Sequence, residues 1–145
     1  MKISSDGLEL IKRYEGLRLK AYKCPAGIPT IGYGHTRGVT MGMTITEEIA
    51  DHLLQEDVAP IEKLLNGMKI NFRQGQFDAL CSWIFNLGSG SFNSSTLKKK
   101  IVAGAPDKEI LAEIRKWDKA KVNGKTVALP GLTKRRAEEC AHWMI

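Results

Sequence analysis

The segment KRYEGLRLKAYKCPAGIPTIGYGHT, residues 12–36, contains the change of periodicity that decides the fold of the N-terminal part of the chain. Residues 4–15 carry apolar side chains at helical spacing, and Gly16 stands where such a helix would end. Residues 17–22 then alternate between apolar and polar side chains, which is the period of a β-strand. The chain is therefore predicted to pass from helix to strand at Gly16.

A second strand is predicted shortly after the first. The residues CPAG, 24–27, place proline and glycine in turn positions, and TIGYGHT, 30–36, has glycines that allow close approach of backbone or ligand. We expect residues 17–36 to form a small β-hairpin packed beside the end of the first helix.

Glu15 is predicted to lie on the apolar face of the first helix. Successive helical residues are about 100° apart, which places Glu15 between Leu8 and Ile11. A carboxylate among apolar side chains loses hydration, which favours its protonated form and suits a general acid. The alternative is a structural glutamate whose stem packs on the core while its carboxylate reaches solvent or an arginine, so the position alone does not establish catalysis.

The rest of the chain is predicted to be mainly helical. Thr44 and Glu47 fit a capping box for a long helix that is kinked or interrupted near Pro60. The Asn-Gly pair in VNGKT, residues 122–126, is a turn signal. The other helix boundaries expected are a start capped by Ser4 or Ser5, an end at Gly88, a start at Ser94 or Ser95, a helix from Pro106 to about Lys119, and a last helix capped by Thr133.

These elements predict one α+β, mainly helical domain over residues 1–145. A β-containing lobe at about residues 15–45 is joined by a helix at about 46–66 to a helical lobe at about 67–145. The first helix, residues 4–15, is expected to pack on the helical lobe. The length suits a single domain with its own core.

Composition indicates a globular protein, with 43% hydrophobic and 26% charged residues. No run approaches the roughly 18 apolar residues of a membrane span, and the N-terminus is too polar for a signal peptide. We therefore expect the protein to accumulate in the cytoplasm. Three cysteines without a CxxC pair suggest neither a disulfide framework nor a zinc site, and no metal or cofactor is expected.

Positive charge is concentrated in the last third of the sequence. Residues 1–97 hold ten Lys or Arg and ten Asp or Glu, whereas residues 98–145 hold twelve and six. This basic region is either a solvated surface or a site of attraction for a polyanion, such as nucleic acid, anionic lipid or an acidic cell-surface polymer.

Glu15, Cys24 and Thr30, separated by eight and five residues and followed by IGYGHT, resemble the phage-type lysozymes, the endolysins of glycoside hydrolase family 24. That family has a Glu, an Asp or less often a Cys, and a Thr at this spacing. The segments QFDALCSWIFNLGSGSFNSSTLKKK, 76–100, and LPGLTKRRAEECAHW, 129–143, are similar to its helical core and C-terminal segments. The resemblance covers nearly the whole chain and implies a lysozyme-like fold.

The resemblance implies a muramidase, which we expect to be a monomer. It would hydrolyse the β-1,4 bond between N-acetylmuramic acid and N-acetylglucosamine in peptidoglycan, cause bacterial lysis, and need a membrane lesion to reach its substrate. Glu15 would be the general acid, Cys24 would help activate a water on the opposite face of the sugar, and Thr30 would help hold that water, which is the inverting geometry.

Cys24 departs from the commoner aspartate. A thiol has an ordinary pKa of about 8.5, so it is mostly neutral at pH 7 unless its surroundings stabilise the thiolate. Three roles stay open: a weaker base or water-orienting group, a covalent nucleophile in a retaining reaction, or a dispensable residue.

Several supporting residues are expected around this site. His35 is either a structural histidine of the hairpin or a partner of Cys24 in a Cys–His dyad. Arg136 resembles an arginine that the family places against its catalytic Glu, although Arg135 or Arg136 facing solvent is the alternative. Tyr33 is expected to bind substrate or to support the site. Other candidates for sugar contacts are Ser82, Asn86, Trp83, Trp117 and Trp143, the tryptophans being core residues otherwise.

Three rival functions remain at the level of sequence. A lytic transglycosylase would cleave the same bond without water and leave a 1,6-anhydro sugar. A Cys24/His35 peptidase or amidase would depend on the thiol rather than on Glu15. A binding module would use the basic last third on nucleic acid or membrane, a role we expect to be at most accessory, as contact with an anionic envelope.

Overall fold

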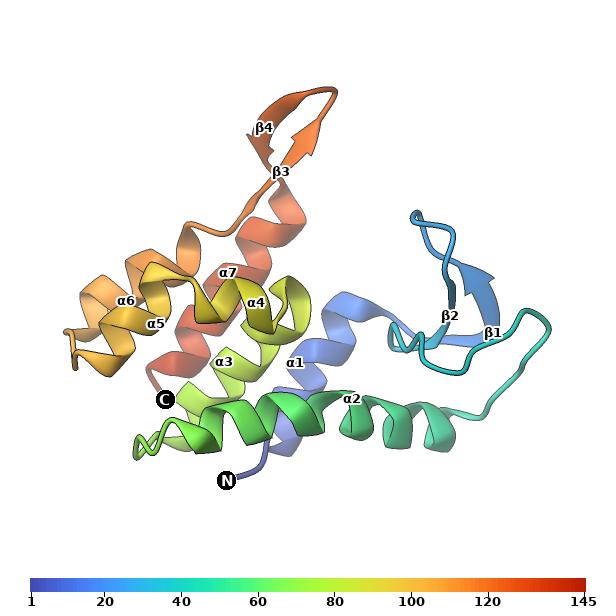
Figure 1. Cartoon of the computed structure of the whole chain (residues 1–145), viewed down its shortest axis with the longest axis horizontal. Coiled ribbons are helices and arrows are strands. Elements are labelled where there is room, and N and C mark those ends of the chain that lie inside the picture. The colour runs from blue at the N-terminus through green and yellow to red at the C-terminus, as the bar shows by residue number, and fades with distance from the viewer.

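The computed structural model describes residues 1–145 as a β-containing lobe, a long connecting helix and a helical lobe (Figure 1). The chain runs from the first helix on the helical lobe out to the β-lobe, and returns along the connecting helix. The α+β architecture predicted from the sequence is confirmed. None of the helices is both long and apolar enough to cross a membrane.

Helix α1, Ser5–Glu15, begins and ends where the sequence indicates. The hydroxyl of its N-cap Ser4 accepts a hydrogen bond from the Gly7 amide, and Gly16, at a φ of 72°, donates its N–H to the Lys12 carbonyl. A left-handed φ of this kind favours glycine. Glu15 is thus the last helical residue before the backbone changes direction.

The β-lobe is built on the predicted hairpin. Strands β1, Arg18–Lys23, and β2, Pro29–Gly32, are antiparallel and place Tyr22 opposite Thr30. An isolated bridge between Lys20 and Thr44 extends the pairing to the segment that precedes the connecting helix.

Helix α2, Glu47–Gly67, differs from the prediction in two respects. Its N-cap is Thr46, whose hydroxyl accepts from the Ile49 amide, so the assignment of the cap to Thr44 was wrong. Thr44 is paired with Lys20 of the hairpin, so the helix begins only after Thr46. The helix also continues through Pro60, so the interruption offered as one alternative was wrong, while a kink at Pro60 stays a prediction.

The helical lobe is arranged around helix α3, Gln74–Leu87, which packs against α1, α2 and the last helix, α7, Pro130–Trp143. The predicted end at Gly88 and the Ser95 cap are confirmed. The core of the lobe includes the wholly buried Phe77, Leu80 and Trp83. The remaining helices are α4, Ser89–Asn93; α5, Thr96–Val102; and α6, Asp107–Arg115.

A second hairpin replaces the end of the helix predicted to reach Lys119. Strands β3, Lys119–Val122, and β4, Lys125–Ala128, project from the helical lobe (Figure 1). Asn123 and Gly124 both have positive φ, 51° and 81°, the combination that suits a two-residue hairpin turn.

Helix α7 begins four residues earlier than expected, because Thr133 is not its cap. The N-cap residue is Leu129, and the Thr133 hydroxyl lies 3.0 Å from the Asp118 carboxylate at the base of the second hairpin. The side chain predicted to start the helix therefore fastens the hairpin to it.

Candidate functional site

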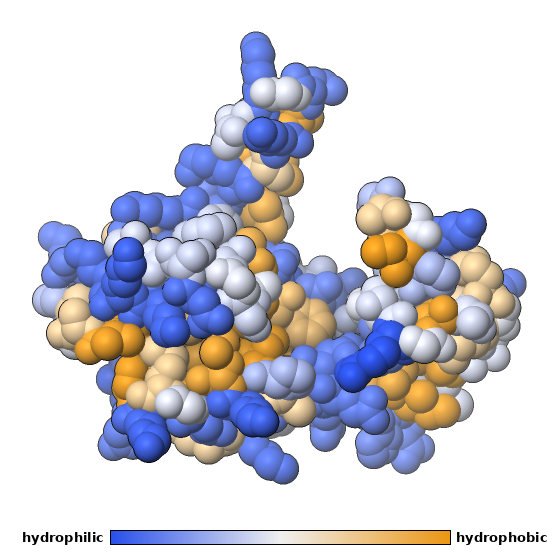
Figure 2. Space-filling model, viewed as in Figure 1, coloured by the Kyte–Doolittle hydropathy of each residue, from blue (hydrophilic) through white to orange (hydrophobic).

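Glu15 lies at the meeting point of two hollows in the surface. One, of about 440 Å³, lies between the lobes and is lined by residues including Gly34, Arg37 and Phe85. The other, of about 390 Å³, lies on the helical lobe and is lined by Asn86 and Leu132 among others. Figure 2 shows the molecule hollowed between the β-lobe and the projecting β3–β4 hairpin. Glu15 is thus presented to an open groove, which Asp57, paired with His35, also lines.

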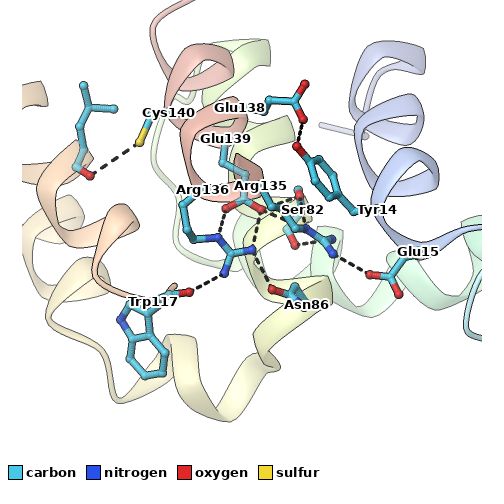
Figure 3. A network of polar contacts seen from close by, with 11 residues as sticks. Tyr14, Glu15, Ser82, Asn86, Trp117, Arg135, Arg136, Glu138, Glu139 and Cys140 are labelled. Carbon is cyan, nitrogen blue, oxygen red and sulfur yellow. Dashed lines mark hydrogen bonds and ion pairs between the residues drawn. The ribbon is translucent and has the colours of Figure 1, made fainter. Parts of the chain in front are cut away.

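Arg135 holds the Glu15 side chain. Its Nη1 atom donates to Glu15 Oε2 at 2.7 Å, and the Glu15 side chain is 22% exposed (Figure 3). The sequence resemblance assigned this contact to Arg136, and that assignment was wrong. Neither arginine faces solvent, since both are almost fully buried.

Arg135 is itself fixed by α3. Its Nε donates to the Ser82 hydroxyl at 3.3 Å, and its Nη2 donates to the Ser82 carbonyl at 3.2 Å. Ser82 is wholly buried and its hydroxyl donates to Glu139 at 2.6 Å. The expectation that Ser82 contacts a saccharide was therefore wrong.

Arg136 connects three other parts of the helical lobe. It pairs with Glu139 at 2.7 Å, donates to the Asn86 side-chain oxygen at 2.8 Å, and donates to the Trp117 carbonyl at 3.2 Å. Asn86 lies in the wall of the second hollow, so it remains a candidate for contact with a ligand.

Tyr14 and Arg13 tie the end of α1 to α7. Both donate to the Glu138 carboxylate, Arg13 at 3.1 Å. The Tyr14 ring lies 5.5 Å from the Arg135 guanidinium carbon. Burial, and next the hydrogen bond to Glu138, raise the pKa of Tyr14 to about 12, so its hydroxyl remains a donor at neutral pH. These contacts fix the helix end that carries Glu15.

Cys24 and Thr30 lie together at the turn of the first hairpin. Cys24 is partly exposed, and hydrogen bonding from the backbone of Ile28 lowers the pKa of its thiol, with the Thr30 side chain contributing. Thr30 is buried and its hydroxyl donates to the Ile28 carbonyl at 2.8 Å. Neither residue lines the two hollows that meet at Glu15. The structure therefore brings Cys24 to Thr30, but not to direct contact with the acid.

His35 is structural, which was one of its two predicted roles. Its Nδ1 lies 2.8 Å from the Asp57 carboxylate on α2, and its Nε2 lies 2.8 Å from the Arg37 carbonyl. Both ring nitrogens are thus occupied, and no Cys–His dyad forms with Cys24. Tyr33, predicted to bind substrate or to support the site, belongs to the buried core, which fits a supporting role and not a substrate contact.

The tryptophans are mainly core residues. Trp83 and Trp143 are buried, whereas Trp117 is 36% exposed and packs edge-on against Trp83, with ring centroids 5.3 Å apart. No group of three or more His, Cys, Asp or Glu side chains is arranged to hold a metal ion.

Gly34 is a site residue that the sequence did not single out for contact with the acid. A Cβ atom at this position would lie 3.4 Å from Glu15 Oε1, and its φ is 85°. The repeated glycines of IGYGHT signalled a close approach, but not its partner.

Comparison with known proteins identifies relatives along the whole chain. The family described as phage lysozyme matches residues 12–139. An endolysin of Acyrthosiphon pisum secondary endosymbiont phage 1 is 54% identical over 142 residues, 97% of each chain. An endolysin of Salmonella phage P22 is 46% identical over 107 residues, 70% of this chain and 73% of the relative.

Two solved structures have the same fold. The muramidase domain of SpmX from Asticaccaulis excentricus superimposes with a TM-score of 0.93 at 39% identity, covering 99% of this chain and 98% of that domain. An endolysin from Escherichia coli O157:H7 phage FAHEc1 gives a TM-score of 0.89 at 39% identity, covering 99% of this chain and 94% of the other.

Proposed function

The chain belongs to the phage lysozyme family and is an endolysin-type glycoside hydrolase of peptidoglycan; on this basis we propose that Glu15 is its general acid. The observation that carries the proposal is the position of Glu15, partly exposed where two hollows meet and held by one buried arginine. The bond cleaved is the β-1,4 bond between N-acetylmuramic acid and N-acetylglucosamine.

In the proposed step, the Glu15 carboxyl gives its proton to the glycosidic oxygen as the bond to the anomeric carbon breaks. The carboxylate that results is stabilised by the Arg135 guanidinium, 2.7 Å away in the free protein. The neutral Asn86 amide, in the wall of the same hollow, donates to a saccharide oxygen. Glu15 thus acts on the leaving group, while Arg135 keeps it in place.

Cys24 and Thr30 are proposed to serve the attacking water. The lowered pKa of the thiol increases its thiolate fraction, and a thiolate can accept the proton that the water loses as its oxygen bonds to the anomeric carbon. Thr30, adjacent to the thiol, orients this group or the water. Attack from the face opposite Glu15 gives inversion at the anomeric carbon.

The primary test compares Glu15→Gln with Cys24→Ala in lysis of permeabilised Gram-negative cells. We expect Glu15→Gln to lose at least about 100-fold in rate, because general acid catalysis contributes about that much. Glu9→Gln, a change of an exposed acid on the same helix, is the matched control and should keep full activity. Full activity in Glu15→Gln would refute the assignment.

The Cys24 variants separate its three roles. If the thiol activates or orients water, Cys24→Ala loses part of the rate and Cys24→Asp recovers it, with an inverted product. A nucleophile would give a retained product and a covalent adduct that mass spectrometry detects, and a dispensable residue would leave Cys24→Ala fully active.

The reaction products separate the hydrolase from the transglycosylase. Mass spectrometry of digested sacculi should show reducing-end muramic acid, whereas 1,6-anhydro ends would indicate cleavage without water. A Cys24/His35 amidase has no geometric support, because both nitrogens of His35 are already engaged.

An accessory electrostatic contact is proposed for the β3–β4 hairpin. Lys119, Lys121 and Lys125 are exposed on it, and residues 119–128 contain no acidic residue. Since the hairpin borders the hollow, these lysines face an anionic envelope as the groove engages its polymer.

Changing the three hairpin lysines to glutamine tests this contact. We expect weaker binding to sacculi and a flatter dependence of binding on salt, with kcat on soluble glycan unchanged. The control replaces three exposed lysines elsewhere by glutamine, which removes the same total charge: Lys63, Lys69 and Lys108. Equal effects in both variants would mean that net charge alone is responsible.

The protein is proposed to act as a monomer and to reach the wall through a membrane lesion. Expression in bacteria with and without a lesion-forming protein tests this route, and lysis in both cases would refute it. Sedimentation of the active protein tests the oligomeric state.

A further inference from the structure

Glu139 is a buried carboxylate at the centre of the network that ends at Glu15. Its side chain is 0% exposed. Three groups surround it: the Arg136 guanidinium at 2.7 Å, the Ser82 hydroxyl at 2.6 Å and the Arg135 Nε at 3.5 Å (Figure 3). The side chain therefore has no contact with the groove.

The network reaches the groove on the side of Glu15. Arg135, Arg136 and Glu139 are all buried; Glu15 lines both hollows, whereas Arg135 and Asn86 border only the second. Two guanidinium groups on neighbouring residues repel each other, and a buried charge requires a partner. Glu139 supplies that partner to both arginines, which fixes the direction in which Arg135 points.

Resting on the proposed function of Glu15, we infer that Glu139 is a positioning residue for the acid, acting through Arg135. With its carboxylate in place, Arg135 approaches Glu139 and Ser82 through Nε and reaches Glu15 through Nη1. Without that negative charge, the Arg136 guanidinium repels Arg135, and the pair with Glu15 changes geometry.

This role predicts a loss in kcat rather than in KM. Glu139 lines neither hollow, so its effect on substrate binding is expected to be small and limited to the Asn86 side chain that Arg136 holds. A misplacement of a reacting group by about 1 Å can cost about 100-fold in rate. For Glu139→Gln we expect kcat to fall about 10- to 100-fold, with KM within about twofold of the original value.

A double-mutant cycle distinguishes positioning from a merely structural role. If Glu139 acts through Arg135, Glu139→Gln lowers kcat strongly in the original chain but by less than about twofold in an Arg135→Gln background. A structural role gives the same proportional loss in both backgrounds. Such additivity, or a loss confined to KM, would overturn the inference.

Two further variants test whether a loss of kcat comes only from a loss of stability. Glu113→Gln neutralises another buried carboxylate of the helical lobe, which pairs with Lys116 at 2.5 Å, and should leave kcat unchanged. If Glu139→Gln does not fold, Ser82→Ala removes the hydroxyl shared by Glu139 and Arg135 with less disturbance. Its expected result is a several-fold loss in kcat that disappears in the Arg135→Gln background.

Glu15→Gln separates this inference from the proposed function. An active Glu15→Gln variant would refute the acid itself. An inactive Glu15→Gln variant together with a fully active, folded Glu139→Gln variant would refute only the positioning role.

Discussion

Gly34 allows the backbone of the β-lobe to lie directly against the proposed acid. Its φ of 85° is strained for any other residue, and an added Cβ would meet Glu15 Oε1 at 3.4 Å. We expect Gly34→Ala to lower the free energy of unfolding by about 1–2 kcal/mol because of the backbone conformation. We also expect it to lower kcat, because the methyl group, in van der Waals contact with Glu15 Oε1, restricts access to the carboxylate.

Gly38→Ala is the matched control for this substitution. Gly38 has a similar φ of 72° but nothing within 4 Å of an added Cβ. Its variant should lose comparable stability in chemical denaturation while keeping its activity. Equal kcat values in the two variants would show that the contact with Glu15 has no catalytic effect.

Cys24 is expected to be the only thiol that reacts in the folded protein. Cys81 and Cys140 are 0% and 2% exposed, and burial raises the pKa of both. The pKa of Cys24 is lowered, so its thiolate forms at lower pH and the midpoint of its alkylation should lie below that of a cysteine in an unstructured peptide. Iodoacetamide labelling across pH, read by mass spectrometry, measures this, and a midpoint at or above that of such a peptide would contradict it.

At the scale of elements, the sequence predicts best where a periodicity has a clear physical cause. The first helix and its hairpin were predictable because Gly16 separates a helical apolar face from an alternating strand. The β3–β4 hairpin was not, because nearly all of its residues are exposed and no buried face imposes an alternating pattern. Its Asn-Gly turn was the one available signal.

The sequence alone also did not indicate which of two neighbouring arginines holds Glu15. Arg135 and Arg136 are neighbours, and α7 is packed against both α3 and α6, so either position was able to face a buried partner. Only the rotation of α7 in the fold decides that Arg135 points to α1.

That rotation depends on a close contact between α3 and α7 at Gly75. A Cβ on Gly75 would lie 2.1 Å from the His142 carbonyl oxygen, which is backbone and cannot move away cheaply. Gly75→Ala should therefore destabilise the protein by about 1–3 kcal/mol or more, even though alanine favours helices by about 1 kcal/mol.

Gly90→Ala provides the comparison for Gly75→Ala. Gly90 lies in α4 with nothing within 4 Å of an added Cβ, so its variant should be unchanged or slightly more stable. Thermal unfolding compares the two, and a Gly75→Ala variant as stable as Gly90→Ala would contradict the close packing.

At the scale of the whole molecule, the groove is made from parts that are distant in the sequence. Glu15 ends a helix that packs on α3 and is tied to α7, whereas Cys24 and Thr30 belong to the β-lobe. The proposed acid and the proposed water site are thus carried by different lobes. Relative motion of the lobes would change the distance between them.

This arrangement predicts an order of local stability that does not follow the sequence. Amide hydrogens of α1 should exchange with solvent as slowly as those of α3, because both helices belong to one packed core. Amides of β1 should exchange faster, through local opening, because most of that strand is exposed. Native-state hydrogen exchange at low denaturant, followed by NMR, measures the three sets. If the amides of α1 instead exchange at the same rate as those of β1, the N-terminal helix opens together with the β-lobe. Glu15 and Cys24 would then belong to one moving unit, and motion of the lobes would not change the distance between them.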